Sequence, residues 1–335
     1  MSAPIRTDPA ATERPPPRQP YRPGALEALS VALVLLVIGQ HWLASMFTSP
    51  AMQAGATVFV AIVVQATPFL VLGTLLSGAI AAYVPPSFFQ RVLPRRAILA
   101  VPVAGASGLL LPGCECASVP VAGGLMARGV TPAAALAFLL SSPAINPVVI
   151  VATFVAFPRD HMMALARLVA SLITAVVVGW LWMRFGKGEW LRIPRRQHPV
   201  EASRLQIFRT TVGEDFLQAG GFLCIGAFAA AVLNVVIPPS WLDALASRPW
   251  LEIIALALLA VLLSICSEAD AFVAASLTQF SLTARLAFLV IGPMVDLKLI
   301  ALQVGTFGKA FAVRFAPVTF LVGVTVASLV GWWLL

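Results

Sequence analysis

Residues 53–82 read QAGATVFVAIVVQATPFLVLGTLLSGAIAA, and they lie within a longer stretch, 28–90, that contains no Asp, Glu, Lys or Arg. A charge-free stretch of that length holds two membrane spans of about 20 residues each. Further charge-free stretches cover residues 129–158, 168–183, 216–242 and 315–335. A soluble fold would not bury so many uniformly apolar helices, so the sequence predicts an all-α polytopic membrane protein.

The overall composition supports the same class. Hydrophobic residues make up 60% of the chain and charged residues only 11%, whereas a soluble domain carries about 25% charged residues. The net charge is +8, but most basic residues lie in the N-terminal tail or in loops beside apolar runs. This distribution favours contact with a lipid bilayer, and we expect no nucleic-acid partner. Four cysteines are too few for a disulfide scaffold.

The chain has none of the common enzyme motifs. There is no HExxH, no Walker loop and no dinucleotide fingerprint after a strand. We therefore expect no cofactor and no enzyme activity. Transport by this chain would have to draw on an ion gradient, a partner ATPase or the gradient of the substrate itself.

Two basic segments, one before and one after the first group of apolar stretches, set the orientation in the membrane. Residues 1–24 contain seven prolines and four arginines, which predicts a disordered cytoplasmic tail. The run at 25–47 has full spanning length, so it is an extra N-terminal span rather than a signal peptide. From 184 to 215 the chain carries seven Lys or Arg residues. We expect its central part, 185–214, to be a cytoplasmic basic loop.

The second half of the sequence repeats the first. Motifs that recur in the same order are Tyr83-Val84-Pro85-Pro86-Ser87 with Val236-Ile237-Pro238-Pro239-Ser240, Ala135-Leu136-Ala137-Phe138-Leu139 with Arg285-Leu286-Ala287-Phe288-Leu289, Pro143 with Pro293, and Asn146 with Asp296. Between these anchors Cys114 falls opposite Cys266. The sequence therefore predicts an internal repeat, with one transmembrane unit at 53–184 and a second at 215–335.

Counting crossings gives the two units opposite orientations. The basic residues at 91–96 and the loop at 184–215 both belong on the cytoplasmic side. Residues 97–127 must then enter and leave on one side, as a hairpin with its tip near Cys114. The same count predicts a hairpin at 250–279, broken near 264–270. If 97–127 instead crosses once, the topology changes by one span.

The prediction is thus an inverted repeat of two units, each with three spans plus a broken or re-entrant helical hairpin, preceded by one extra N-terminal span. Such repeats with broken helices are typical of secondary transporters. We expect a multi-pass protein of the inner (cytoplasmic) cell membrane, with its C-terminus in the periplasm.

The segment Pro112-Gly113-Cys114-Glu115-Cys116-Ala117-Ser118-Val119-Pro120 is the first candidate site. Thiolates are soft ligands that prefer trivalent arsenic, copper(I) or zinc, so Cys114 and Cys116 are candidate metal ligands. Glu115 is an ionisable group at membrane depth, and such groups usually mark an ion or proton path. The alternative is that both cysteines are small apolar fillers.

The corresponding segment of the second half is Ser264-Ile265-Cys266-Ser267-Glu268-Ala269-Asp270. Glu268 and Asp270 are again acids in an apolar surrounding, although a solvated loop turn would also explain them. If the repeat is real, the two breaks meet near the middle of the bilayer. The site would then combine three thiols with the three acids Glu115, Glu268 and Asp270.

A second pair of breaks lies at Ser141-Ser142-Pro143-Ala144-Ile145-Asn146-Pro147 and at Gly292-Pro293-Met294-Val295-Asp296-Leu297-Lys298. Proline frees a backbone carbonyl one turn earlier, and such carbonyls can coordinate ions, but a structural kink is an equal alternative. Asp296 and Lys298 would partly neutralise charge nearby. Cys224 lies on an apolar helix and is interpreted as filler.

The predicted roles are as follows. Substrate binding is assigned to Cys114, Cys116, Cys266 and Asn146. Proton coupling is assigned to Glu115, Glu268, Asp270 and Asp296. A metal would be held by Cys114 and Cys116.

Five motifs together carry a resemblance to a known family: Pro112–Cys116, Val119-Pro120-Val121, Ser142–Pro147, Cys266–Phe272 and Gly292–Lys298. In these motifs the chain resembles a family of predicted permeases that includes the ArsP-type organoarsenical efflux permeases. The Cys-Glu-Cys form is similar to the YcgR-like branch. The resemblance covers about residues 55–310 and implies a permease. Members of this branch are often paired with a second membrane protein, which implies a second membrane subunit, and a homo-oligomer is the other option.

The leading functional hypothesis is a secondary permease that exports a thiol-reactive metalloid or soft metal and is coupled to protons. One alternative is a membrane thiol oxidoreductase that cycles Cys114 and Cys116 as a disulfide. Another is a permease subunit for a different small solute or a metal such as zinc.

Overall fold

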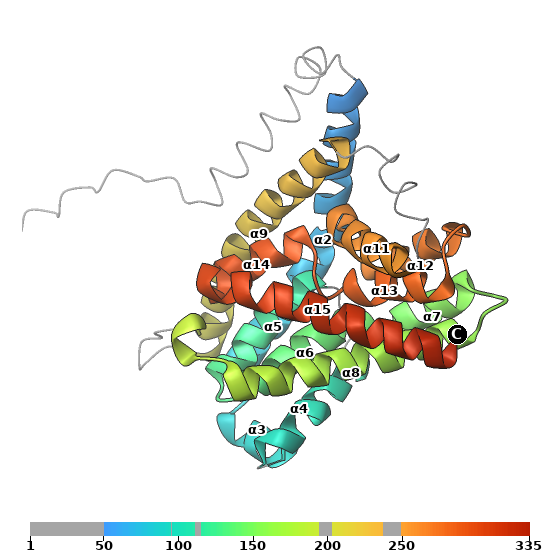
Figure 1. Cartoon of the computed structure of the whole chain (residues 1–335). Coiled ribbons are helices and arrows are strands. Elements are labelled where there is room, and N and C mark those ends of the chain that lie inside the picture. The colour runs from blue at the N-terminus through green and yellow to red at the C-terminus, as the bar shows by residue number, and fades with distance from the viewer. Residues whose placement is uncertain (1–49, 95, 111–114, 194–202, 237–248) are drawn as a thin grey trace, which may run out of the picture. The chain divides into compact units, whose positions relative to one another are not determined.

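The computed structural model describes residues 50–94, 96–110, 115–193, 203–236 and 249–335. The predicted tail and the predicted extra N-terminal span lie outside these residues, as does Cys114. In the described ranges all regular elements are helices (Figure 1).

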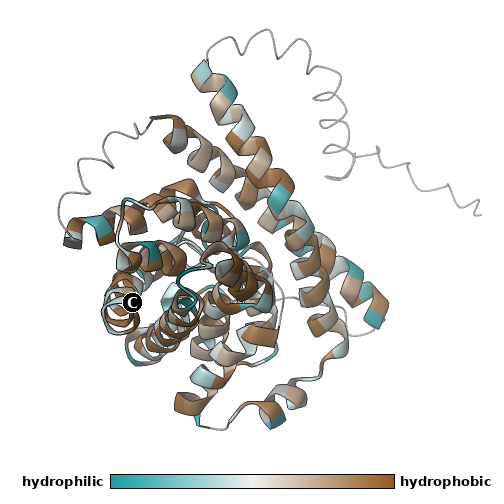
Figure 2. Cartoon of the chain, turned by 90° about the vertical axis from the view of Figure 1, so that its right-hand side faces the viewer, coloured by the Kyte–Doolittle hydropathy of each residue, from teal (hydrophilic) through white to brown (hydrophobic). Residues whose placement is uncertain are grey.

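Four long helices carry most of the membrane-spanning length: α2 (Pro50–Tyr83), α8 (Met162–Phe185), α9 (Arg204–Val236) and α15 (Lys309–Leu334). With the segment Pro132–Ala156, they are the five helical segments of the described chain that are long and apolar enough to cross a membrane. Figure 2 shows hydrophobic residues along most of the helical ribbon. The prediction of an all-α polytopic membrane protein is confirmed.

Between α2 and α8 the helices are short. In chain order they are α3 (Pro86–Val92), α4 (Ala97–Ala106), the 3-10 turn η1 (Ser107–Leu110), α5 (Glu115–Ala127), α6 (Pro132–Ile145) and α7 (Pro147–Ala156). A ten-residue helix such as α7 rises about 15 Å, which is half the thickness of a bilayer core. A span can therefore be built only by joining two of these short helices across a break.

In the described residues, the second half also places short helices between two long ones. A 3-10 turn, η2 (Gly188–Trp190), precedes α9, and the short helices that follow are α11 (Pro249–Leu263), α12 (Ser267–Ser276), α13 (Leu282–Ile291) and α14 (Leu297–Phe307). Thus α4, α5, α6 and α7 of the first half correspond to α11, α12, α13 and α14 of the second. The opposite membrane orientation of the two halves stays a prediction.

The breaks have local causes. Asn146 is extended (φ −60°, ψ 154°) between α6 and α7, as expected for a residue that precedes a proline. At the end of α11, Ser264 has a φ of +49°, a conformation that side chains other than glycine rarely adopt. The break in the second half ends at Cys266, earlier than the predicted range of 264–270, because α12 already begins at Ser267.

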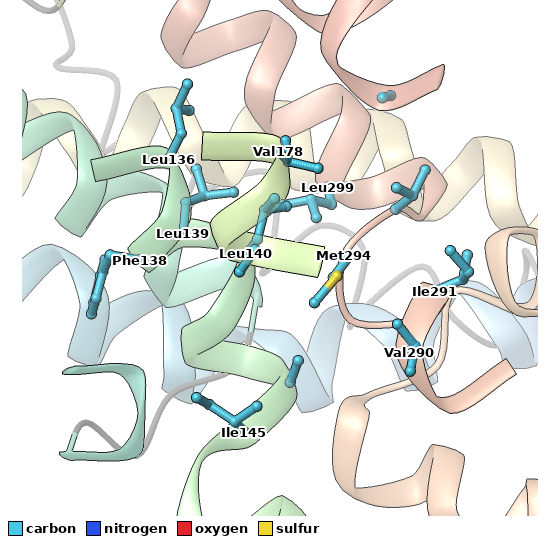
Figure 3. Close-up of a cluster of buried hydrophobic side chains, with 14 of the residues drawn as sticks. Leu136, Phe138, Leu139, Leu140, Ile145, Val178, Val290, Ile291, Met294 and Leu299 are labelled. Atoms are coloured by element: carbon cyan, nitrogen blue, oxygen red, sulfur yellow. The ribbon is translucent and has the colours of Figure 1, made fainter. Parts of the chain in front are cut away.

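The centre of the molecule is formed by α6 and α13. Every α6 residue from Ala133 to Ile145 is buried, which is typical of a helix surrounded by other helices. Figure 3 shows Leu136, Leu139 and Leu140 near Val178, Leu299 and Met294. Helices α8 and α15 pack on this centre and on each other.

Helices α2 and α9 lie along one another. Gly55 of α2 is next to Val235 of α9, and Gly78 of α2 is next to Phe208, so the two helices run antiparallel. Helix α9 begins at Arg204, eleven residues before the predicted start of the second unit at 215. Its first turns carry charged residues, so a prediction based on apolar stretches did not include them.

Candidate functional site

The short helices of one half contact those of the other in two matching pairs. Helix α5 packs against α14, and α7 packs against α12. Three of these helices, α7, α12 and α14, follow a break in the described chain, and all four carry an acidic or amide side chain at or beside their first residue. The helix starts are therefore brought together at a buried site, which is the arrangement expected of discontinuous helices in transporters.

Lys298, on the first turn of α14, is the centre of the α5/α14 pair. It is 2% exposed. Its Nζ lies 2.5 Å from Glu115 Oε1 and 3.4 Å from Asp296 Oδ2. The same Nζ donates to the carbonyl oxygens of Ser264 (2.9 Å) and Ile265 (3.2 Å). One cation thus compensates two carboxylates and also satisfies two carbonyl groups that the break between α11 and α12 would otherwise leave unpaired.

Glu115 joins the two halves of the chain. It is fully buried at the start of α5. Its Oε1 contacts Lys298, and its Oε2 accepts a hydrogen bond of 3.1 Å from the hydroxyl of Ser267, the first residue of α12. A carboxylate at this depth is stable only with such partners.

Asn146 and Asp296 have equivalent positions as helix N-caps. The Asn146 side chain accepts from the Val149 amide at 2.9 Å, and the Asp296 side chain accepts from the Leu299 amide at 2.6 Å. Both residues are fully buried. Capping satisfies backbone donors that the helix start leaves without an internal partner.

Arg167, from α8, is the centre of the α7/α12 pair. Its side chain is fully buried. Its Nη1 donates to the Thr153 hydroxyl at 2.8 Å, and its Nη2 donates to the Ser267 carbonyl at 3.1 Å. It also interacts electrostatically with Asp270 and Glu268. In this pair the cation comes from a neighbouring span rather than from the paired helices.

The two predicted acids of the second half differ in exposure. Asp270 is 2% exposed, and its Oδ2 has no hydrogen-bond partner among the described residues. Glu268 is only partly buried. Both lie on the first turn of α12 rather than in the break itself, where a negative charge interacts favourably with the helix dipole.

The structure brings two of the predicted thiols to the same place. Cys116 is fully buried and Cys266 is 3% exposed, and Lys298 interacts electrostatically with both. Cys224 is exposed on α9. Among the residues described, no group of three or more His, Cys, Asp or Glu side chains could hold a metal ion. Because Cys114 lies outside those residues, the predicted metal pair of Cys114 and Cys116 stays a prediction.

Sequence reasoning missed Arg167 and underrated Lys298. Arg167 is the only charged residue between His161 and Met183, and a lone cation inside an otherwise apolar span was the available signal. Ser267 and Thr153 carried no comparable signal, since single hydroxyl groups are common in apolar helices.

An apolar cavity of about 500 Å³ lies beside the site. It is bounded by residues of α2, α5, α6 and α9, and its hydroxyl-bearing side chains are Ser118 and Ser142. Ser118 is one turn from Glu115 and donates to the carbonyl of that residue at 2.9 Å. The cavity therefore connects an apolar space to the charged end of α5.

The charges around the breaks do not balance. Among the described residues, the acids around the breaks are Glu115, Glu268, Asp270 and Asp296, whereas the cations are Lys298 and Arg167. If all were ionised, two negative charges would remain uncompensated in a largely buried region, which is costly. The site is thus suited to binding protons or a cationic species.

A comparison with protein families assigns the chain. The model of the ArsP-type family, described as predicted permease, matches residues 52–331. The chain belongs to this permease family. The match includes both pairs of broken helices, and it confirms the family resemblance found in the sequence motifs.

Two curated relatives of this permease support the assignment. It is 34% identical to UPF0718 protein YcgR of Bacillus subtilis over 282 residues, which cover 81% of this chain and 94% of the relative. It is 31% identical to a Streptococcus mutans protein whose name describes a two-component membrane permease complex subunit, over 82% of this chain and 94% of the relative. No solved structure matches the chain. The protein is thus a multi-pass membrane protein of a permease family.

Proposed function

We propose that this permease is a secondary exporter of a thiol-reactive metalloid or soft metal and that it is coupled to protons. The single observation that carries the proposal is the cluster of four carboxyl groups and two cations where the broken helices meet, with Cys116 and Cys266 beside it. The excess of carboxyl groups supports proton binding. The two thiols support a soft cargo.

The neighbouring cavity supports an organic form of that cargo. Its apolar walls between α2, α5, α6 and α9 suit a methyl or aryl group, while the polar or thiol-reactive end of the same molecule would face Glu115 and Cys116. The full burial of Cys116 gives the thiol oxidoreductase alternative no support, because such an enzyme needs an accessible thiol.

We further propose that the protein acts in the inner (cytoplasmic) membrane with a second membrane subunit. The name of the Streptococcus mutans relative supports a complex of this kind. In this proposal the loop at 184–215 is cytoplasmic.

The test is uptake into everted membrane vesicles that contain the full-length protein. The panel comprises trivalent methyl- and phenylarsenicals, arsenite, copper(I) and zinc, each with and without a protonophore. We expect protonophore-sensitive uptake of at least one of them. Cys116→Ser and Cys266→Ser should lower it, whereas Cys224→Ser, which changes an exposed thiol, should not.

Glu115→Gln and Glu268→Gln test the coupling. Glutamine keeps the shape of a protonated acid, so both variants should retain exchange across the membrane but lose uphill uptake. Uptake of the whole panel at background rate would refute the proposed cargo. Wild-type uphill uptake by both Gln variants would refute the coupling.

A further inference from the structure

One face of α7 is apolar and uncovered. Val148, Val151 and Val155 are 52%, 61% and 60% exposed, respectively. Their spacing places them on one side of the helix. The opposite side carries Val149 and Thr153, which are fully buried against the Arg167 site.

The corresponding face of α14 is covered by α9. The two N-caps, Asn146 and Asp296, align the helices, so the three exposed valines correspond to Lys298, Ala301 and Gly305. A Cβ added to Gly226 of α9 would lie 2.5 Å from Lys298 Cα and 3.1 Å from Ala301 Cβ, and one added to Gly305 would clash with the ring of Phe222. Helix α9 therefore covers the α14 positions whose counterparts on α7 are exposed.

Helices α5 and α12 differ in the same way, because among the described helices α5 is covered by a long helix and α12 is not. Helix α2 covers α5, with Gly73 against Ala117 and Ser77 against Gly124. The alignment of Cys114 with Cys266 places Ala117 and Gly124 opposite Ala269 and Ser276 of α12. Ala269 is partly exposed and Ser276 is exposed. The pair α2/α9 thus covers α5/α14, while α7/α12 has no equivalent cover among the described helices, and Figure 1 shows α7 and α12 together on the side away from α9.

A carboxyl group lies on the uncovered side of α12. Glu268, which is partly buried, and Phe272, which is 53% exposed, are one helical turn apart on the same stripe. Arg167, the cation that interacts with Glu268, also interacts with the buried Asp270, so this partly exposed carboxyl group stays costly against lipid tails. Lipid alone is therefore a poor occupant of this face, and a protein surface with a hydrogen-bond donor or a cation opposite Glu268 is a better one.

We propose that the α7/α12 face, defined by Val148, Val151, Val155, Glu268 and Phe272, binds a pair of transmembrane helices from a second membrane subunit. The inference rests on the proposed function in taking this permease to be part of a two-component complex. The two long helices of this chain that pack on half-helices in this way, α2 and α9, are already placed on α5 and α14. A second copy of this chain could contribute its own α2/α9 pair only if these helices left its own α5 and α14.

The experiment is site-specific photo-crosslinking with p-benzoylphenylalanine at Val151 and, separately, at Phe272 of the full-length chain in membranes of the native host. The control position is Leu321 on α15, which is 65% exposed and outside the proposed face. The same three variants are also purified and placed singly in nanodiscs of phosphatidylethanolamine and phosphatidylglycerol.

We expect Val151 and Phe272 to capture the same distinct protein in native membranes, through residues of its apolar spanning helices, while Leu321 captures lipid. In nanodiscs without a partner, all three positions should capture lipid. Adding the purified captured protein to the nanodiscs should restore the adduct. Val155→Trp, which adds bulk to the face, should lower its yield several-fold.

Three outcomes would overturn the proposal: lipid adducts alone at Val151 and Phe272 in native membranes, adducts with a second copy of this chain, or an internal adduct with residues 25–47. Crosslinking does not depend on transport. A failure here therefore leaves the permease proposal standing, and inactive vesicles with an intact adduct would refute only the proposed cargo.

Discussion

The α5/α14 and α7/α12 pairs can be compared residue by residue. Each pair begins at chain breaks, and each has a capped half-helix, with Asp296 in one and Asn146 in the other. The cations differ in origin. Lys298 belongs to α14 itself, whereas Arg167 reaches the other pair from α8.

Both cations nevertheless lie at the junction between α11 and α12. Lys298 donates to the carbonyls of Ser264 and Ile265, and Arg167 donates to the carbonyl of Ser267. Lys298 satisfies carbonyl groups of the break itself, which lie at membrane depth without helical partners, whereas Arg167 binds the first residue of α12.

The largest expected effect comes from removing the cation of the α5/α14 pair. Lys298→Met leaves Glu115 and Asp296 buried without their partner, and breaking such a pair costs about 3–5 kcal/mol. SDS unfolding of the purified protein in mixed micelles measures the change in the free energy of unfolding. Lys309→Met, at the exposed start of α15, is the matched control, and equal stability of the two variants would show that the pair is not required.

The second effect tests the cation of the α7/α12 pair. Arg167→Met removes the bonds to Thr153 and Ser267 and should cost about 2–3 kcal/mol. We expect a smaller loss of stability than for Lys298→Met because Glu268, one of the two acids that interact with Arg167, is only partly buried. The control is Arg209→Met, at an exposed position of α9. If Arg167→Met proved the more harmful in the same unfolding assay, the order of the two sites would be reversed.

The third prediction compares the two caps. Asn146→Ala should lower the free energy of unfolding by about 1 kcal/mol, the usual cost of losing an N-cap. Asp296→Ala should cost about twice as much, because it also removes a carboxylate from Lys298. Asp296→Asn separates the two contributions, since it keeps a capping side chain and removes the charge. Identical unfolding curves for Asp296→Ala and Asn146→Ala would mean that the charge adds nothing.

The smallest effect concerns the bond that joins the two pairs. Ser267→Ala removes the hydroxyl that donates to Glu115, and should cost about 1 kcal/mol. Ser276→Ala, at the exposed end of α12, is the control in the same titration. A loss no greater than that of the control would indicate that the two pairs are independent.

Several parts of this arrangement could be predicted from local sequence. Long apolar stretches identified the spans, since the hydrophobic effect acts on each segment separately. The break at Asn146 followed from Pro147, because a proline restricts the residue before it. Glu115, Asp270 and Asp296 were predicted as buried functional residues because acids are rare in apolar segments, and the structure buries all three.

Other parts could not be predicted in this way. The start of α9 at Arg204 was missed because its first turns are charged and helix formation there does not depend on an apolar stretch. The pairing of Lys298 with Glu115 joins residues far apart in the chain, and no local pattern specifies it. The role of Arg167 depends equally on contacts with α7 and α12.

The side chains alone were enough to predict an α-helical membrane protein in which motifs of the first half recur in the second and several acids and thiols lie in apolar segments. Those properties follow from the side chains of each segment and their cost in lipid. The packing of the helices decides which cation compensates which acid, and it places α2 and α9 over one pair of half-helices but not over the other. Such choices depend on distances between segments, which are fixed when the helices pack and not before.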